Sequence, residues 1–416
     1  MGGWRKSKLY EVADLVMGQS PDSIFYNDEM KGMKFLQGCS EFGEKFPTAK
    51  IYTISVKKIA PKNSILFSVR APVGKVNFAD TEFCIGRGLA AIVPKNFDLN
   101  FLHQTFLFLE TNSKFVSQGS TFDSINSSVL KELKIAHPES LTEQTCIAEI
   151  LTTADAAIEQ TEKLIAKYQR IKTGLMQDLL TKGIDANGNI RSKATHKFVV
   201  KNGIEVPEEW SVEYLGDVCS KIQDGTHFSP QTSDDGEFMY LTSKNIRLGY
   251  LDLSNVEFIN RKQHEDIYRR CAVKFGDVML TKDGANTGNA TINNIQEQVS
   301  LLSSVCIIRG KEDVLNNNFL LSLLLCERGQ RLIKDSMSGL AITRVTLRII
   351  NKFIFPIPPL SEQIEISNRI QQMENSIVLF RKDLEKFQSI KNGLMQDLLS
   401  GRVRVKTTLA PVLSFS

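Results

Sequence analysis

The sequence predicts two similar α/β domains, each followed by one long helix, and three observations lead to this fold. The heptapeptide Gly-Leu-Met-Gln-Asp-Leu-Leu occurs twice, at Gly174–Leu180 and at Gly393–Leu399. Each copy closes a helical stretch, and the two tryptophans of the chain, Trp4 and Trp210, open similar stretches upstream. The predicted fold class is therefore a duplicated α/β (α+β) chain with a pseudo-two-fold internal repeat.

The repeat sets the predicted domain boundaries. The tryptophans are 206 residues apart and the heptapeptides 219, so the second globular domain is the longer one. The linker is polar and has a turn signal at Asn187-Gly188. The predicted segments are globular domain 1 (1–140), helix 1 (141–182), the linker (183–206), globular domain 2 (207–359), helix 2 (360–401) and a C-terminal tail (402–416).

Composition favours a soluble protein of two ordinary cores, because 416 residues are 42% hydrophobic. The seven cysteines are scattered and never spaced as C-x-x-C, so neither a disulfide framework nor a zinc site is expected. The longest apolar run, Phe319–Cys326, is too short to span a bilayer. We therefore expect a cytoplasmic protein without a membrane segment, and its net charge of +4 does not by itself indicate nucleic-acid binding.

Apolar residues recur in both helical stretches at alternating steps of four and three, the pattern of a coiled-coil seam. We expect the two helices to pair as an antiparallel coiled coil that separates the globular domains. The alternative is that each helix packs only on its own domain. The predicted seam residues are Ile147, Leu151, Ile158, Ile165, Tyr168, Leu175 and Leu179 in helix 1, and Ile366, Ile370, Ile377, Leu384, Phe387, Leu394 and Leu398 in helix 2.

Both seams are interrupted at the same place. Lys172 and Lys391 stand where an apolar residue is due, and a glycine follows two positions later. We interpret this as a local shift of the seam beside a tight helix contact, because a glycine within a helix costs about 1 kcal/mol relative to alanine. Thr142 and Ser361 suit the N-cap position, and the glutamates after them, Glu143 and Glu362, favour the positive end of the helix dipole.

Within each globular domain, short β-rich runs alternate with turns, and one helical run comes near the end. Polar, glycine-containing loops, Ser68–Lys75 and Thr281–Gly288, follow two of the predicted strands. Such loops can present arginine, lysine, asparagine and threonine to base edges and phosphates, although ordinary solvated turns have the same composition. The predicted strands are 50–56, 64–69, 89–93, 238–242, 277–281 and 304–308, and the predicted helices are 101–115 and 318–334.

With these motifs the chain resembles the specificity (S) subunits of type I restriction-modification systems over nearly its whole length. The resemblance is most specific at the helix ends, Thr173–Thr181 and Asn392–Ser400, and at Pro358–Gln363 before helix 2. The counterpart of that segment, His137–Gln144, lacks the second proline. Met17–Pro21 and Asp224–His227 look like openings of the recognition domains in this family.

The resemblance implies a DNA-binding adaptor that is not itself an enzyme. Each globular domain would recognise one half of a bipartite, asymmetric target in double-stranded DNA, and the helices would set the spacing and dock two modification (methyltransferase) subunits. The modification subunits would carry S-adenosylmethionine for adenine methylation, and restriction (motor and nuclease) subunits would carry ATP and Mg²⁺. A coiled-coil DNA-binding regulator or an interaction scaffold acting without such partners remains the alternative.

For contacts to DNA we expect polar residues of the loops. In the first domain they are Gln19, Ser20, Arg70, Lys75 and Arg87; in the second they are Thr226, His227, Lys244, Asn245, Lys282, Asn286 and Arg344. No catalytic or metal-binding residue is predicted, since no P-loop is present and the five histidines lie far apart. Gly86-Arg87-Gly88-Leu89-Ala90-Ala91 formally fits a dinucleotide-binding pattern, but a strand and a proline follow where that pattern needs a helix.

Overall fold

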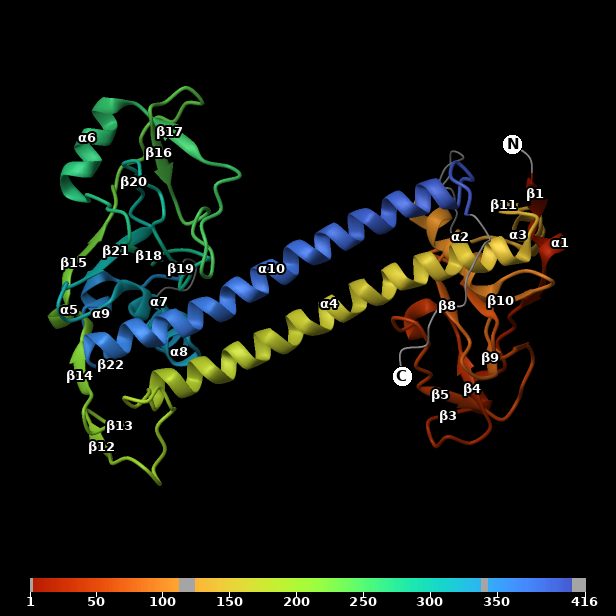
Figure 1. Cartoon of the computed structure of the whole chain (residues 1–416), viewed down its shortest axis with the longest axis horizontal. Helices are drawn as coiled ribbons and strands as arrows, with labels where there is room; N and C mark the ends of the chain where they lie inside the picture. Colours follow the sequence, from red (N-terminus) through yellow and green to blue (C-terminus); the bar gives the residue numbers. More distant parts are fainter. Residues whose placement is uncertain (1–2, 112–123, 338–342, 406–416) are drawn as a thin grey trace. The chain divides into compact units, whose positions relative to one another are not determined.

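The computed structural model describes residues 3–111, 124–337 and 343–405. The chain forms two compact units. Unit 1 comprises residues 1–163 and 381–416, and unit 2 comprises residues 164–380. The two long helices, α4 (Leu141–Thr181) and α10 (Leu360–Leu398), each contribute to both units (Figure 1). Each unit therefore contains one half of each helix.

Unit 1 contains two sheets, a strand pair and short helices. The central sheet has the order β2 (Ala13–Met17), β10 (Leu89–Pro94), β7 (Ile65–Ser68), β8 (Val76–Phe78). The outer sheet has the order β3 (Tyr26–Asn27), β5 (Ile51–Thr53), β4 (Met33–Leu36), β9 (Phe83–Ile85), β6 (Ile59–Ala60). β1 (Trp4–Lys8) pairs with β11 (Lys134–Pro138). The helices are α1 (Leu9–Val12), α2 (Leu99–Thr111) and α3 (Ser127–Lys131), with 3-10 turns at Ser23–Phe25 and Cys39–Glu41.

Unit 2 repeats this arrangement. Its central sheet has the order β15 (Cys219–Asp224), β21 (Val305–Gly310), β18 (Val278–Thr281), β19 (Ala290–Ile292). Its outer sheet has the order β17 (Glu257–Ile259), β16 (Phe238–Leu241), β20 (Ser300–Leu301). β14 (Ser211–Tyr214) pairs with β22 (Ile354–Ile357), and β12 (Phe198–Lys201) with β13 (Ile204–Pro207). The helices are α5 (Leu215–Val218), α6 (Arg261–Arg270), α7 (Asn317–Leu325), α8 (Glu327–Asp335) and α9 (Leu347–Ile350).

Each central sheet lies between two apolar layers, because alternate residues of a strand point to opposite faces. In β10, Ala90 and Ile92 join the core beneath α2, whereas Leu89 and Ala91 join the core beneath the outer sheet. β21 of unit 2 alternates in the same way between the core of α7 and that of the outer sheet. All six predicted strands are confirmed, at β5, β7, β10, β16, β18 and β21.

The predicted helices are confirmed with one difference. α2 covers most of the first, whose last residues lie outside the described part of the chain. The second prediction is wrong in one respect, because two helices, α7 and α8, replace a single run. The break is at Cys326, which caps α8 by accepting a hydrogen bond from the Gly329 backbone N–H. Any side chain at Gly329 would collide with the Leu323 carbonyl, so the chain turns tightly here.

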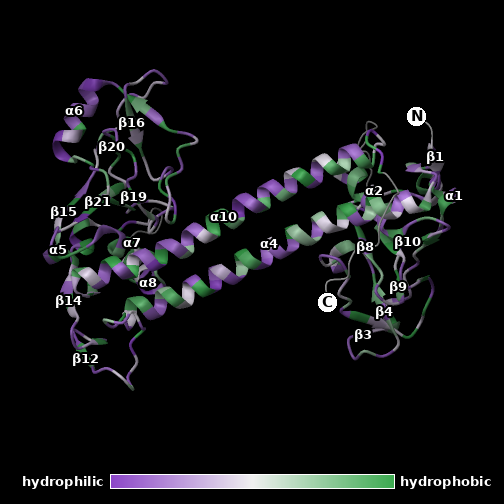
Figure 2. Ribbon diagram, viewed as in Figure 1, coloured by the Kyte–Doolittle hydropathy of each residue, from purple (hydrophilic) through white to green (hydrophobic). Residues whose placement is uncertain are grey.

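The long helices contact each other within each unit. All fourteen predicted seam residues are buried or half-buried, and purple and green turns alternate along both helices (Figure 2). In unit 2 the rings of Tyr168 and Phe380 meet edge to face at 4.9 Å. One helix turn further along α4, Lys172 forms an ion pair with Glu374. Residue numbers rise along one helix while those of their partners fall along the other, which is an antiparallel contact.

The lysines that interrupt the seam are explained by ion pairs. Lys172 binds Glu374 in unit 2, and Lys391 binds Asp155 in unit 1. Each ion pair joins α4 to α10. The two lysines occupy equivalent positions in the two copies of the repeat. The expectation of a tight helix contact at the glycines is wrong, because a Cβ atom at Gly174 or at its repeat counterpart would have nothing within 4 Å among the described residues.

A buried carboxylate near the start of each helix holds the chain that follows the other helix. In unit 2, Glu362 binds Arg191 through two contacts of 2.5 and 3.1 Å, and the indole N–H of Trp210 donates to it at 3.2 Å. In unit 1, Glu143 binds Arg404 through two contacts of 2.7 Å. We name these two arrangements the carboxylate clasps.

The clasps depend on the turns that end the helices. Gly183 after α4 and Gly401 after α10 have φ values of +64° and +74°, the left-handed conformation typical of a glycine after a helix. A Cβ atom on Gly183 would collide with Trp210, and one on Gly401 would lie 2.9 Å from the Trp4 ring. Each tryptophan therefore packs against the turn that leads to the arginine of its clasp.

Two local predictions differ from the structure, at the helix starts and in the segment between the two units' sequences. The helices begin at Leu141 and Leu360, one residue before the predicted caps Thr142 and Ser361, and the Ser140 hydroxyl accepts from the backbone N–H of Glu143 at 3.3 Å. The segment 183–206, predicted as a polar surface linker, contains a strand, and its Ile184, Arg191 and Val206 side chains are buried in unit 2.

Replacing Arg191 tests the clasp of unit 2. Arg191→Met leaves Glu362 as a buried charge without its cation, so we expect the free energy of unfolding to fall by about 3–5 kcal/mol. Lys193→Met, which removes an exposed ion pair of the same segment with Glu205, is the matched control and should change it by less than about 1 kcal/mol. Urea unfolding of the full chain measures both, and equal losses would contradict this role of Arg191.

Candidate nucleic-acid interface

In each unit most of the predicted contact loops lie at one edge of the central sheet, whereas the Lys244–Asn245 turn follows β16 of the outer sheet. β2 and β7 end at this edge and β10 and β8 begin there, because neighbouring strands are antiparallel. In unit 2 the same edge holds the ends of β15 and β18 and the starts of β21 and β19. We name this place the loop edge.

The loop edges of the two units share their backbone hydrogen bonds. The N–H of Gly18 donates to Leu89 O at 2.9 Å, as that of Gly225 donates to Val305 O at 3.2 Å. The N–H of Val69 donates to Gly88 O at 2.9 Å. The equivalent bond of unit 2 runs from Lys282 to Ser304 at 2.8 Å. These bonds make Arg70 equivalent to Asp283 and Arg87 equivalent to Ser303.

In unit 1 the predicted residues lie largely open to solvent. Gln19, Arg70, Lys75 and Arg87 are exposed. Ser20 is half-buried, and its hydroxyl accepts a hydrogen bond from the backbone N–H of Arg87 at 3.2 Å. Lys75 forms an ion pair with Glu110 of α2. The loop edge of unit 1 is thus a polar, cationic surface.

In unit 2 two carboxylates lie within the loop edge. The Asp224 side chain is 6% exposed and contacts Arg270 at 3.0 Å, His227 at 3.2 Å and the ammonium of Lys282 at 3.6 Å. Asp283 contacts the same ammonium at 2.8 Å. The buried lysine therefore lies between two carboxylates, which offset the loss of its hydration.

Three predicted contact residues are buried and bound within the protein. Asn245 donates to the carbonyls of Asp252 and Asn255, and Thr226 accepts from the backbone N–H of Phe228. Lys282 is 5% exposed. We therefore correct the expectation for these three, because each side chain is enclosed by the unit that it stabilises.

The remaining candidates of unit 2 are accessible. His227 and Lys244 are exposed, and so is Arg344, whose guanidinium donates to Asp283 at 2.9 Å. Asn286 is half-buried and donates to Ser243 O at 3.0 Å, so it ties two loops together. Sequence reasoning missed Asp224, Asp283 and Arg270. The quoted motif Asp224–His227 contained a signal, because it includes an aspartate at the end of a strand.

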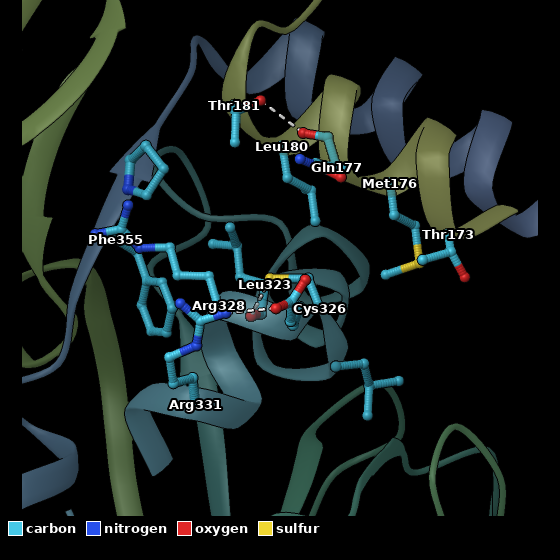
Figure 3. A pocket seen from close by; sticks show the side chains of 13 residues that line it. Thr173, Met176, Gln177, Leu180, Thr181, Leu323, Cys326, Arg328, Arg331 and Phe355 are labelled. Carbon is cyan, nitrogen blue, oxygen red and sulfur yellow. Dashed lines mark hydrogen bonds and ion pairs between the residues drawn. The ribbon is translucent and has the colours of Figure 1, made fainter. Parts of the chain in front are cut away.

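A second candidate region involves the first heptapeptide. In unit 2 a cavity of about 260 Å³ lies between α4, the α7–α8 pair and β22 (Figure 3). Met176, Gln177 and Leu180 line it from α4, and Cys326 and Arg328 line it from the other side. Gly174 lies between Thr173 and Met176, which both line the cavity, and is itself exposed. The heptapeptide thus has one side in the core and one side open.

Within the described residues, no group of three or more histidine, cysteine, aspartate or glutamate side chains is placed to hold a metal ion. Over the same residues, no helix combines the length and the apolar character needed to cross a membrane. The strand β10 follows Gly86-Arg87-Gly88, where a dinucleotide-binding pattern requires a helix.

Two similar units, each with a polar loop edge and a share of a repeated helix, define a duplicated binding module. The family model described as type I restriction modification DNA specificity domain matches residues 1–169 and 207–387. The chain belongs to this family.

Named relatives agree with this assignment. A putative type I restriction enzyme MjaX specificity subunit of Methanocaldococcus jannaschii is 38% identical over 181 residues, which is 43% of this chain and 41% of the relative. The MjaVIII specificity subunit of the same organism is 24% identical over 97% of this chain and 93% of its own length.

Solved structures share the fold. The S subunit of a type I restriction-modification system from M. genitalium has a TM-score of 0.58 at 17% identity, covering 95% of this chain and 96% of that one. The HsdS subunit from Thermoanaerobacter tengcongensis has a TM-score of 0.50 at 16% identity, covering 97% and 98%. The predicted family is confirmed, and with it the pair of mixed α/β specificity domains.

The position of Lys282 predicts a structural role for it. In Lys282→Met the carboxylates of Asp224 and Asp283 face each other without the ammonium between them, so we expect a loss of about 2–3 kcal/mol in the free energy of unfolding. Lys244→Met, at an exposed position, should change it by less than about 0.5 kcal/mol. Urea unfolding monitored by circular dichroism compares the two variants. A Lys282→Met protein as stable as the wild type would refute this role.

Proposed function

We propose that this chain is the DNA-recognition subunit of a type I restriction-modification complex. The loop edge of each unit recognises one half of a bipartite, asymmetric target in double-stranded DNA. The chain itself catalyses no reaction. Modification subunits bring S-adenosylmethionine for adenine methylation, and restriction subunits bring ATP and Mg²⁺.

The observation that carries this proposal is a shared loop-edge backbone with different side chains in the two units. The same hydrogen bonds position Arg70 in one unit and Asp283 in the other. A protein distinguishes bases by matching its hydrogen-bond donors and acceptors to theirs. Two loop edges of different charge therefore favour two different half-sites. Membership of the specificity family supports DNA as the ligand.

The repeated helices are proposed to pair as an antiparallel coiled coil that fixes the spacing between the half-sites. The ring contact between Tyr168 and Phe380 and the two repeat-related ion pairs, Lys172–Glu374 and Lys391–Asp155, support this pairing. A stiff connection between two recognition domains converts their separation into a fixed number of base pairs.

The heptapeptides are proposed to dock the two modification subunits. Gly174 and Gly393 are exposed, and nothing in the described chain approaches them. Glycine weakens a helix, and no contact within the described chain requires a glycine at either position. A partner whose backbone comes close to the helix would supply one, because only glycine leaves that space free. Two equivalent glycines then provide two equivalent docking sites.

Mapping modified bases tests the proposed function. In the host, we expect the gene to be required for methylated adenines at one bipartite sequence with unlike halves. Single-molecule sequencing of the genome with and without the gene measures this. An unchanged set of methylated sites, combined with tight and specific DNA binding by the isolated chain, would instead identify a regulator.

Enlarging Gly174 tests the docking surface. In the isolated chain, Gly174→Gln should be tolerated, with a small gain in stability from the better helix former. In the complex we expect the side chain to obstruct the modification subunit and to weaken its binding at least about tenfold, equivalent to ~1.4 kcal/mol. Ala156→Gln, at another exposed position of α4, is the control. Titration of the modification subunit measures the affinity, and equal binding by both variants would exclude Gly174 from the interface.

A further inference from the structure

Arg87 stands on a turn of the loop edge in unit 1 that hydrogen bonds and close packing hold in place. Its backbone N–H donates to the hydroxyl of Ser20. The glycines on both sides pack against the end of β4. A Cβ atom on Gly88 would lie 2.5 Å from the Gln37 carbonyl oxygen, and one on Gly86 would lie 3.1 Å from Gln37 Cα. A side chain at Gly88 would collide with this backbone and one at Gly86 would be crowded by it, so the two glycines permit the close approach.

Neighbouring loops hold the turn from two further directions. The N–H of Gly86 donates to Leu36 O of β4 at 2.8 Å, and that of Leu89 donates back to Gly86 O at 3.0 Å. The N–H of Val69 donates to Gly88 O at 2.9 Å, which brings the loop of Arg70 alongside. A side chain on such a turn is presented at a fixed place, so little order has to be gained on binding.

The side chain of Arg87 is exposed. Its guanidinium forms neither an ion pair nor a hydrogen bond within the described chain. Exposed amides lie on the adjoining loops, at Gln19 and Gln37. Unit 2 has Ser303 at the position of Arg87, and at the neighbouring position it has Asp283 instead of Arg70. At these two equivalent backbone positions, unit 1 has guanidinium groups and unit 2 has none.

We infer that Arg87 is a specificity-determining residue that recognises a guanine in the half-site bound by unit 1. This inference rests on the proposed function. A guanidinium can donate two parallel hydrogen bonds to guanine O6 and N7 in the major groove, and no other base offers two acceptors there. The fixed turn supplies the orientation that such a bidentate contact requires. The neighbouring Arg70 adds positive electrostatic potential, but the contact to guanine is inferred for Arg87 alone.

Three variants of the full chain, each assembled with its modification subunits, test this role. Arg87→Gln removes the charge and the fork, whereas Arg87→Lys keeps the charge and removes only the fork. Arg5→Gln removes an exposed arginine of β1 in the same unit and is the control. Methylation rates are compared on the wild-type target and on targets that differ from it by one base pair.

We expect both Arg87 variants to lose about 10- to 100-fold of the preference for one G·C pair in one half of the target, with the other half and the control unchanged. Retention of that preference by both Arg87 variants, uniform weakening on all targets with a smaller salt dependence, or no change at all would overturn the inference, since the first two outcomes describe a phosphate contact. If the wild-type complex methylates no bipartite sequence, the proposed function itself fails. If it does and Arg87 has no effect, only this inference fails.

Discussion

The buried carboxylate at the start of each long helix is the interaction on which each unit depends. Glu362 lies in the first turn of α10, where free backbone N–H groups and the helix dipole favour a negative charge. It also accepts from the backbone N–H of Ile184 at 2.9 Å, so one carboxylate gathers the helix start, the chain after α4 and Trp210. In unit 1, Arg404 holds the pKa of Glu143 below its ordinary value of 4.5. The folded state therefore favours the charged carboxylate of Glu143, and the free energy of unfolding falls as the pH drops from 4.5 toward the lowered pKa.

The strands and helices of this fold can be predicted from local sequence patterns, whereas the carboxylate clasps cannot. The strands and the helix seams follow from periodicities of two and of three to four residues, which the chain shows without tertiary information. The partner of Glu143 is Arg404, 261 residues away along the chain, and no local pattern marks that arginine among the other cations. The sequence predicted that Glu143 and Glu362 favour the positive end of the helix dipole, but their burial with an arginine required the structure.

The loops could be predicted from the sequence because polar residues follow apolar strands, and Ser68–Lys75 and Thr281–Gly288 do follow β7 and β18 at one edge of each central sheet. The surroundings of the individual residues could not be predicted in this way. Lys282 and Lys244 both stand in predicted contact loops, yet one is buried between carboxylates and the other is exposed. Residue type cannot distinguish them, because the neutralising carboxylate of Asp224 comes from a different strand. Burial depends on which strands are neighbours, and that is a property of the fold.

The glycines of the loop edge show how recognition can change while the fold stays constant. A side chain on Gly18 would collide with the Gly86 carbonyl, and one on Gly225 would collide with the Leu301 carbonyl. The backbone is therefore held by the same steric limit in both units, independently of what the exposed positions carry. At one position the charge is reversed, from the exposed Arg70 to Asp283, which binds Lys282 and Arg344, while the backbone hydrogen bonds around it stay the same. Because the backbone frame does not depend on the exposed side chains, substitution at an exposed position such as Arg70 or Arg87 should cost little stability, unlike substitution of the buried Lys282.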